Sequence, residues 1–260
     1  MKSARLYTEI VRYIHSLADS DEYLRRSVMR RADFSRRRKL GFTDYVYLTV
    51  QNLKTSLQAG LNAFIDAQKN GEIEYSKQAF SKGRQRIRPE AFQELYQAVV
   101  MKFYEKAEIH SWKGYQLFGI DGTRMNLLCT EELAQLYGAQ TSQGAPQVQT
   151  LVSCVYDLLN GIIVDTRFAH CKSSERDAAK DRITAFQLVQ AENPVFVMDR
   201  GYPSAELIDG IMNAGHKFIM RCPTEFLRGM KIPKMDNTLE HKFARLKHSS
   251  DENPTFKRKY

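Results

Sequence analysis

The hydrophobic pattern of this chain of 260 residues changes its period near Gly114, and the change divides the chain into two structural classes. Before Gly114, apolar residues recur every three or four positions, for example over 45–68 and 88–108, which is typical of amphipathic helices. The first of these helical patterns ends near Asn70-Gly71. Pro89 suits the first turn of the second helix. Backbone N–H groups in a first turn have no acceptor within the helix, so the absence of an N–H in proline costs no hydrogen bond there. The chain up to about Lys113 is therefore expected to be all-helical.

After Gly114, short apolar runs bounded by turn residues alternate with helical patterns. Residues 146–170 contain two strand patterns joined by Asn160-Gly161, a strong hairpin signal. The order strand, hairpin, helix, strand, helix, strand predicts a mixed α/β sheet. The predicted elements after Gly114 are strand 115–123, hairpin 146–170, helix 173–192, strand 194–199, helix 204–215 and strand 216–222.

Three segments follow from these patterns. Residues 1–113 form a helical domain, and residues 114–230 form an α/β core. Residues 231–260 are charged, contain Pro233 and Pro254, and show no regular period, so they are a loop, a disordered end or the start of a further structure.

Cysteine usage and hydropathy favour a soluble intracellular protein. The four cysteines lie far apart, with no CxxC pair and no histidine at zinc-ligand spacing, so reduced thiols are expected. No run approaches the roughly 18 apolar residues of a membrane span.

Asp121 and Asp199 share one local pattern, an apolar strand, an aspartate, and a glycine within two residues. In sheets with crossover connections, functional groups collect where strands end. Two such aspartates on neighbouring strands suit a hard divalent cation, and two ions about 4 Å apart support phosphodiester chemistry. The alternative is that each aspartate only caps the following turn or helix.

The chain is basic, with a formal net charge of +9, and two segments concentrate this charge. Residues 25–39 carry eight basic side chains against one acid, Asp33. The last four are consecutive, so on a helix they would cover most of its circumference and offer a stripe for phosphate contacts. The alternative is a solvated charged surface. The run consists of Arg36, Arg37, Arg38 and Lys39.

The second basic segment spans 75–92. Ser76 is placed to cap a short helix on which Ala79, Phe80 and Ile87 face inward. A short polar helix after a longer one suits a reader of the helix-turn-helix type, although an ordinary surface helix has the same pattern. Its basic residues include Lys82, Arg84 and Arg86.

With these motifs in view, the chain resembles the DDE transposases of bacterial insertion sequences, specifically the insertion-sequence-four superfamily. The resemblance covers most of the chain from Arg25 to Arg221, in the right order. The span 147–177, a hairpin followed by a helix start, fits the same family pattern. The stretches that carry the resemblance are 34–64, 79–92, 119–127 and 197–221.

This resemblance implies a ribonuclease-H-like α/β core preceded by an all-helical domain that binds DNA ends. It implies two-metal cleavage and transfer of DNA strands with Mg²⁺ or Mn²⁺, with Asp121 and Asp199 as the first and second catalytic, metal-binding carboxylates. It also implies double-stranded DNA, both transposon ends and target, as partner, a homodimer in the synaptic complex, and a cytoplasmic protein on the bacterial nucleoid. The residues it assigns to DNA binding are Arg36, Arg37, Arg38, Lys39, Lys82, Arg84 and Arg86.

The chain departs from the family at the third carboxylate. In the family this is a Glu on a helix that carries Tyr, Arg, Glu and Lys and follows a β-rich insertion. Phe218, Arg221 and Glu225 imitate this spacing, but Phe replaces Tyr and Pro223 interrupts any helix through Glu225. Lys231 also arrives one residue early. We interpret Glu225 as coincidental and expect the chain to stop inside the insertion, without the third carboxylate.

Two alternatives remain open from the sequence. One is a non-catalytic DNA-binding fragment that inhibits a full-length transposase. The other is a compact metal-dependent nuclease, which requires Glu225 or Glu175 to complete the site with both aspartates.

Overall fold

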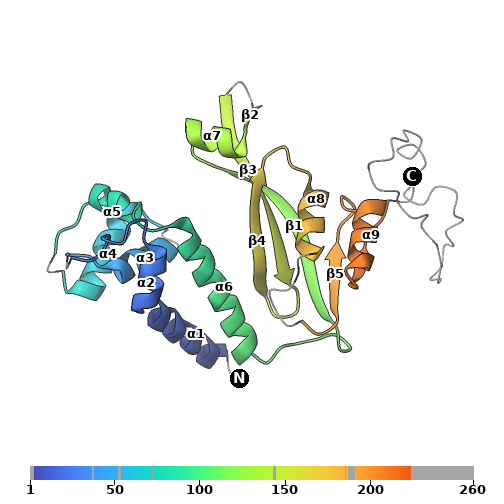
Figure 1. Ribbon diagram of the computed structural model, residues 1–260, viewed down its shortest axis with the longest axis horizontal. Helices are drawn as coiled ribbons and strands as arrows, with labels where there is room; N and C mark the ends of the chain where they lie inside the picture. Colours follow the sequence, from blue (N-terminus) through green and yellow to red (C-terminus); the bar gives the residue numbers. More distant parts are fainter. Residues whose placement is uncertain are drawn as a thin grey trace, which may run out of the picture. The chain divides into compact units, whose positions relative to one another are not determined.

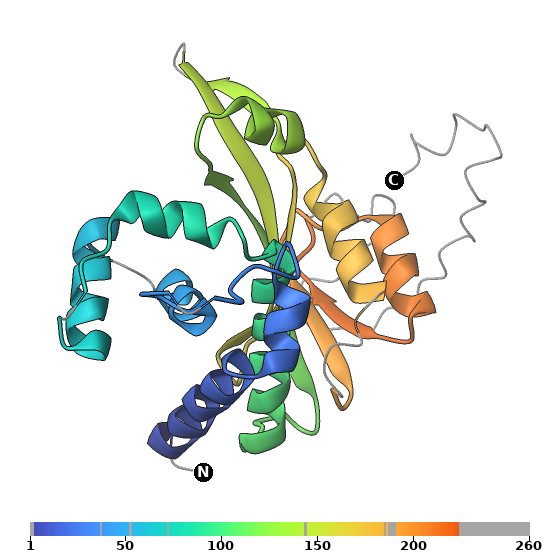
Figure 2. The same ribbon diagram turned by 60° about the vertical axis from the view of Figure 1, so that its left-hand side comes forward.

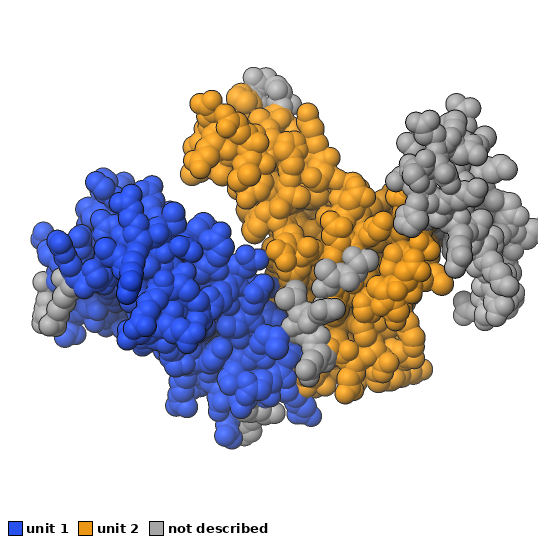
Figure 3. Space-filling view, viewed as in Figure 1, with its two compact units in different colours: residues 1–108 blue, residues 109–260 orange. Residues whose placement is uncertain are grey.

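The computed structural model describes residues 3–36, 38–51, 54–71, 73–142, 145–184, 186 and 191–223. The chain separates into two compact units, residues 1–108 and 109–260, coloured blue and orange in Figure 3. In the described residues the first unit contains helices, and the second contains a six-stranded sheet with helices (Figure 1). The expected mixed α/β class is confirmed.

The helices of the first unit begin at residues that the sequence marks as caps. Ser76 Oγ accepts a hydrogen bond from Ala79 N at 3.2 Å, and Pro89 opens the last helix as expected. The long helical pattern 45–68 is broken, because Ser56 caps a new helix through Ala59 N at 3.3 Å. The helices are α1 (Ser3–Ala18), α2 (Asp21–Ser27), α3 (Phe42–Val50), α4 (Leu57–Lys69), α5 (Lys77–Arg84) and α6 (Pro89–Lys106).

Aromatic residues dominate the core of the first unit. Tyr23 is fully buried, and its hydroxyl donates to the carbonyl of Ala91 at 2.7 Å, which ties α2 to α6. Tyr45 of α3 stacks on Phe80 of α5, with ring centroids 5.0 Å apart. Burial raises the pKa of Tyr23 to about 12, so its hydroxyl stays a donor at neutral pH.

The sheet of the second unit is mixed. β1 (Gln116–Asn126) is central, antiparallel to β3 (Ala145–Asp157) and parallel to β5 (Pro194–Met198). β4 (Ile162–His170) pairs antiparallel with β3, and β6 (Lys217–Met220) pairs parallel with β5. The spatial order across these five strands is therefore β4-β3-β1-β5-β6.

The β3–β4 hairpin is confirmed. Gly161 has a φ of 70°, which a residue without Cβ adopts at no steric cost. Asn160 Nδ2 donates to both carboxylate oxygens of the buried Asp157, at 3.0 and 2.9 Å. Asn160 also exchanges hydrogen bonds with the backbone of His110, so the turn anchors the segment that leads into β1.

Two elements between β1 and β3 were not predicted. They are α7 (Glu131–Tyr137), capped by Thr130, and β2 (Ala139–Ser142), which pairs with the start of β3. α7 is only seven residues long, so the apolar spacing of Leu133, Leu136 and Tyr137 covers less than two full turns and is a weak helix signal.

Helices α8 (Glu175–Thr184) and α9 (Ala205–Asn213) lie side by side, and α8 contacts β1 and β3 (Figure 2). Phe118, Phe186 and Phe196 pack together in the core, with centroids 4.9 to 6.0 Å apart. Ser174 and Ser204 cap the two helices. No helix among the described residues is long and apolar enough to cross a membrane.

We predict that Tyr23→Phe destabilises the chain by about 1–3 kcal/mol, because the buried carbonyl of Ala91 loses its donor. Urea unfolding measures the change. Tyr7→Phe is the matched control, since Tyr7 is 71% exposed, and its effect should stay within about 0.5 kcal/mol. Equal stability of both variants would contradict the assigned role of the hydrogen bond.

Candidate functional site

The two aspartates occupy different positions along their strands. Asp199 directly follows β5, as expected. Asp121 was expected at the end of its strand, and this is wrong, because β1 continues to Asn126. The extension has a clear cause, since β3 pairs with β1 over nine positions from Phe118 to Asn126. Gly122 suggested a turn after Asp121, but its backbone is part of the antiparallel pairing between β1 and β3.

The parallel pairing of β1 with β5 brings the two aspartates level. Gly119 and Val197 are the last register partners of the two strands, and Asp121 and Asp199 each lie two residues beyond this pair. Residues two apart in a strand point to the same face of the sheet. Both aspartates are exposed, and Asp121 Oδ1 accepts the Gly122 N–H at 2.9 Å.

The turn after Asp199 is fixed by several hydrogen bonds. The Tyr202 N–H donates to the Asp199 carbonyl at 3.2 Å, and Arg176 Nε of α8 donates to the Gly201 carbonyl at 2.7 Å. Ser204 caps α9 by accepting from the N–H of Leu207 at 3.1 Å. Capping of α9 is thus assigned to Ser204, and the Asp199 side chain is left exposed.

Glu175 and Tyr202 lie beside the aspartates. A Cβ added to Gly122 would meet Glu175 Cγ at 2.9 Å, so the absent side chain of Gly122 leaves the space that Glu175 fills. Tyr202 is only 2% exposed, and its hydroxyl has no hydrogen-bond partner among the described residues. Burial raises the pKa of Tyr202, and the charges of Asp121, Glu175 and Asp199 raise it further.

Sequence reasoning missed the position of Tyr202 and named Glu175 only under an alternative. The turn residues around Asp199 drew attention to the aspartate and not to a role for Tyr202 in the site. Gly122 was a usable signal, since a glycine in a strand often marks a close approach by another element.

The two aspartates suit a hard divalent cation, which takes carboxylates together with water and phosphate oxygens. Within the described part of the chain, no group of three His, Cys, Asp or Glu side chains is close enough to hold a metal. Glu175 does not form such a group with both aspartates in this arrangement, so the compact-nuclease alternative gains no support from Glu175. Glu225 lies outside the described residues.

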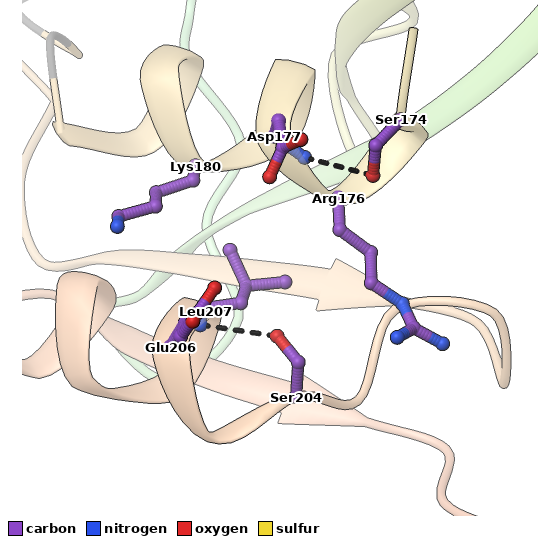
Figure 4. Close-up of a pocket in the computed structure, with 7 residues that line it drawn as sticks. All are labelled: Ser174, Arg176, Asp177, Lys180, Ser204, Glu206 and Leu207. Carbon is purple, nitrogen blue, oxygen red and sulfur yellow. Dashed lines mark hydrogen bonds between the residues drawn. The ribbon is translucent and has the colours of Figure 1, made fainter. Parts of the chain in front are cut away.

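A cavity of about 210 Å³ lies between the first turns of α8 and α9 (Figure 4). Its lining mixes basic and acidic side chains and includes neither Asp121 nor Asp199. The close-up shows Arg176 extending away from Lys180, so the two cations do not converge. We assign this cavity no part in the candidate site. Its lining residues are Ser174, Arg176, Asp177, Lys180, Ser204, Glu206 and Leu207.

The described residues of the consecutive run in the first basic segment do not form a helix, whereas Arg25 and Arg26 of the same segment lie in the last turn of α2. Residues 31–36 and 38–40 form turns and bends. Phe34 adopts a φ of 59°, rare for a bulky residue, and packs edge-on against Phe42 at 5.6 Å and Tyr45 at 5.3 Å. The run is thus attached to the core by Phe34. Its members Arg36, Arg38 and Lys39 are exposed, and Arg37 lies outside the described residues.

The structure brings the two basic segments together. Val28 and Ile87 form a β-bridge, and Met29 N donates to the Arg86 carbonyl at 2.8 Å. Arg86 Nε also lies 4.0 Å from Asp33 Oδ1. Basic residues about fifty positions apart in the sequence therefore share one region of the first unit.

The second segment differs from expectation in two respects. Ala79 is exposed, because it lies in the first turn of α5 beside the Ser76 cap. Phe80 and Ile87 are buried, but Ile87 lies beyond the end of α5 and pairs with Val28 in a β-bridge. Lys82 and Arg84, in the last turn of α5, are exposed.

The residues that imitate the family's third motif do not share a helix. Phe218 lies in β6, and the Arg221 N–H donates to the Met198 carbonyl at 3.1 Å, which continues the pairing with β5. A spacing that places residues on one face of a helix does not place them on one face of a strand. The interpretation of the match as coincidental is consistent with this.

Comparison with solved structures gives a distant similarity. The chain is similar to the piggyBac transposase in a synaptic complex with hairpin DNA, with 11% identity and a TM-score of 0.42. The alignment covers 80% of this chain and 49% of that one, so the chain spans about half the length of this relative. No curated protein matches the chain.

A family model gives the assignment. The model described as the transposase DDE domain matches residues 112–258, which is more than half of the chain and includes both strand aspartates. The chain belongs to the family of proteins that carry the transposase DDE domain.

Proposed function

We propose that this chain is a transposase of the insertion-sequence-four superfamily, which cleaves and transfers DNA strands at insertion-sequence ends with a divalent cation. The observation that carries the proposal is the register of the parallel strands β1 and β5, because the exposed Asp121 and Asp199 each lie two residues beyond its last pair. The strand order β4-β3-β1-β5-β6, an antiparallel meander followed by two parallel strands, supports a ribonuclease-H-like core.

In the proposed site, Asp121 and Asp199 hold Mg²⁺ or Mn²⁺ as a two-metal centre together with water and DNA phosphate oxygens. When bound, the ions activate the attacking water or hydroxyl and stabilise the leaving oxygen. The Gly122 N–H orients the Asp121 carboxylate, and the hydrogen-bonded turn after β5 orients Asp199. Strands make a rigid mount, which keeps the separation of the two carboxylates fixed.

The helical segment, residues 1–113, is proposed to bind transposon ends and target as double-stranded DNA, in a homodimer that pairs both ends. Basic side chains on a folded surface neutralise phosphates and release counterions. The joined basic segments supply such a surface through Arg36, Arg38, Lys39, Lys82 and Arg84, with Arg37 and Arg86 as further candidates. We place the protein in the bacterial cytoplasm, on the nucleoid when it is bound to DNA.

We further propose that Asp121 and Asp199 are two of the three catalytic carboxylates and that Glu225 is not the third. The support is the departure from the third motif at Phe218 and Pro223. A second candidate function follows from the same departure. Without a third ligand, the chain acts as a non-catalytic DNA-binding fragment that inhibits a complete transposase.

Strand cleavage tests the role of the aspartates. The 260-residue chain, incubated with duplex carrying its transposon end and Mg²⁺ or Mn²⁺, should bind the DNA and nick it slowly, because one ligand is missing. Asp121→Asn and Asp199→Asn should each lower the residual nicking by about 100-fold or more and leave DNA binding unchanged.

The outcomes separate the candidates. If nicking persists in both variants, Asp121 and Asp199 are not catalytic. Efficient nicking by the unaltered chain shows that its site is complete. Binding with no nicking under any condition favours the inhibitory fragment.

Salt dependence tests the basic surface. Lys82→Gln and Arg84→Gln should weaken duplex binding and should each lower the slope of log K against log salt by about 1, since each removes one phosphate contact. Fluorescence anisotropy at several salt concentrations measures the slope. Arg12→Gln, an exposed arginine of α1 outside both segments, is the control and should leave the slope unchanged. The same slope in all four proteins would exclude this surface.

A further inference from the structure

The Tyr202 hydroxyl is a buried donor with no acceptor, and it lies among carboxylates. The side chain is 2% exposed, and the hydroxyl has no partner among the described residues. The Gly122 N–H lies near the hydroxyl and lowers the pKa of Tyr202, but it donates its hydrogen bond to Asp121 Oδ1. A buried hydroxyl without a partner costs free energy, and an acceptor that reaches it would remove this cost.

Three carboxylates are candidates for the acceptor. Asp121 and Asp199 are exposed and are assigned to the cation. Glu175 is half-buried and lies against Gly122, the residue whose N–H is near the hydroxyl. Glu175 is therefore the carboxylate that remains for Tyr202 when the two aspartates hold a cation.

Two contacts already join the elements that carry this pair. Glu175 is the first residue of α8, and the adjacent Arg176 Nε donates to the Gly201 carbonyl at 2.7 Å, next to Tyr202. The first turn of α8 is thus attached to the turn that presents Asp199. A hydrogen bond between Glu175 and Tyr202 would close a second link between the same two elements.

We propose that Glu175 and Tyr202 are positioning residues of the cation site, and that the Tyr202 hydroxyl donates to the Glu175 carboxylate once a cation is bound. This inference rests on the proposed function, and it gives Glu175 a role other than that of a direct metal ligand. Without a cation, the charges of Asp121 and Asp199 repel that of Glu175. A divalent cation neutralises this repulsion and lets Glu175 approach Tyr202. The new hydrogen bond then stabilises the loaded geometry.

The affinity of the chain for a cation tests this role of Glu175 and Tyr202, and its measurement does not require catalysis. Titration of the 260-residue chain with Mn²⁺, followed by electron paramagnetic resonance or calorimetry, should show affinity about 10-fold lower in Tyr202→Phe, the loss typical of residues that support metal ligands. Glu175→Gln should lose a comparable factor. The double variant should lose no more than the larger single loss, because the residues act as a pair. Glu206→Gln, an exposed carboxylate in the first turn of α9, is the control.

Thermal unfolding without cation separates positioning from packing. Tyr202→Phe keeps the ring and removes an unpartnered hydroxyl, so its Tm should equal or exceed that of the unaltered chain. A lower Tm with unchanged Mn²⁺ affinity would overturn the proposal and assign the hydroxyl a packing role.

Additive losses in the double variant, or an equal loss in Glu206→Gln, would also overturn it. If the unaltered chain binds Mn²⁺ and Asp121→Asn does not, the proposed function stands even where Tyr202→Phe has no effect. If the unaltered chain binds no Mn²⁺, the cation site and this inference both fail.

Discussion

The parallel pairing of β1 with β5 is the constraint on which the candidate site depends. It joins strands nearly eighty positions apart in the sequence and sets their register through Gly119 and Val197. Because strand side chains alternate between faces, a slip by one residue would move one aspartate to the other side of the sheet. The long ladder between β1 and β3 and the buried phenylalanine cluster oppose such a slip. Specific pairing and packing thus position the two aspartates and leave their side chains exposed.

The support behind the aspartates comes from α8 and from the turn after β5. Gly122 leaves space for Glu175, Arg176 holds the Gly201 carbonyl, and Tyr202 is buried beneath the turn. These contacts fix the direction of the chain on both sides of Asp199. In the first unit, Phe34 has a comparable role, because it attaches an exposed basic loop to the aromatic core. Each candidate surface therefore has an aromatic residue beside it, the buried Tyr202 or the half-buried Phe34.

Local signals predicted the parts of the structure that local interactions stabilise. The Ser76 cap, the first-turn Pro89 and the Asn160-Gly161 hairpin are confirmed, since each depends on residues within a few positions. Predictions failed where distant pairing decided the conformation. β1 extends past Asp121 because β3 supplies partners, and the basic run turns because Phe34 packs into the core. α7 was missed because its seven residues are too few for a clear helical period.

The sequence by itself determined the class of each half, the two strand aspartates and the density of basic charge, because hydrophobic period and residue type are local properties. It also carried the resemblance that the match to the transposase DDE domain supports. Only the tertiary structure decided that Asp121 and Asp199 lie level, that the two basic segments meet, and that Tyr202 is buried without a partner. These facts depend on strand register and packing between segments far apart in the chain, which residue order alone does not specify.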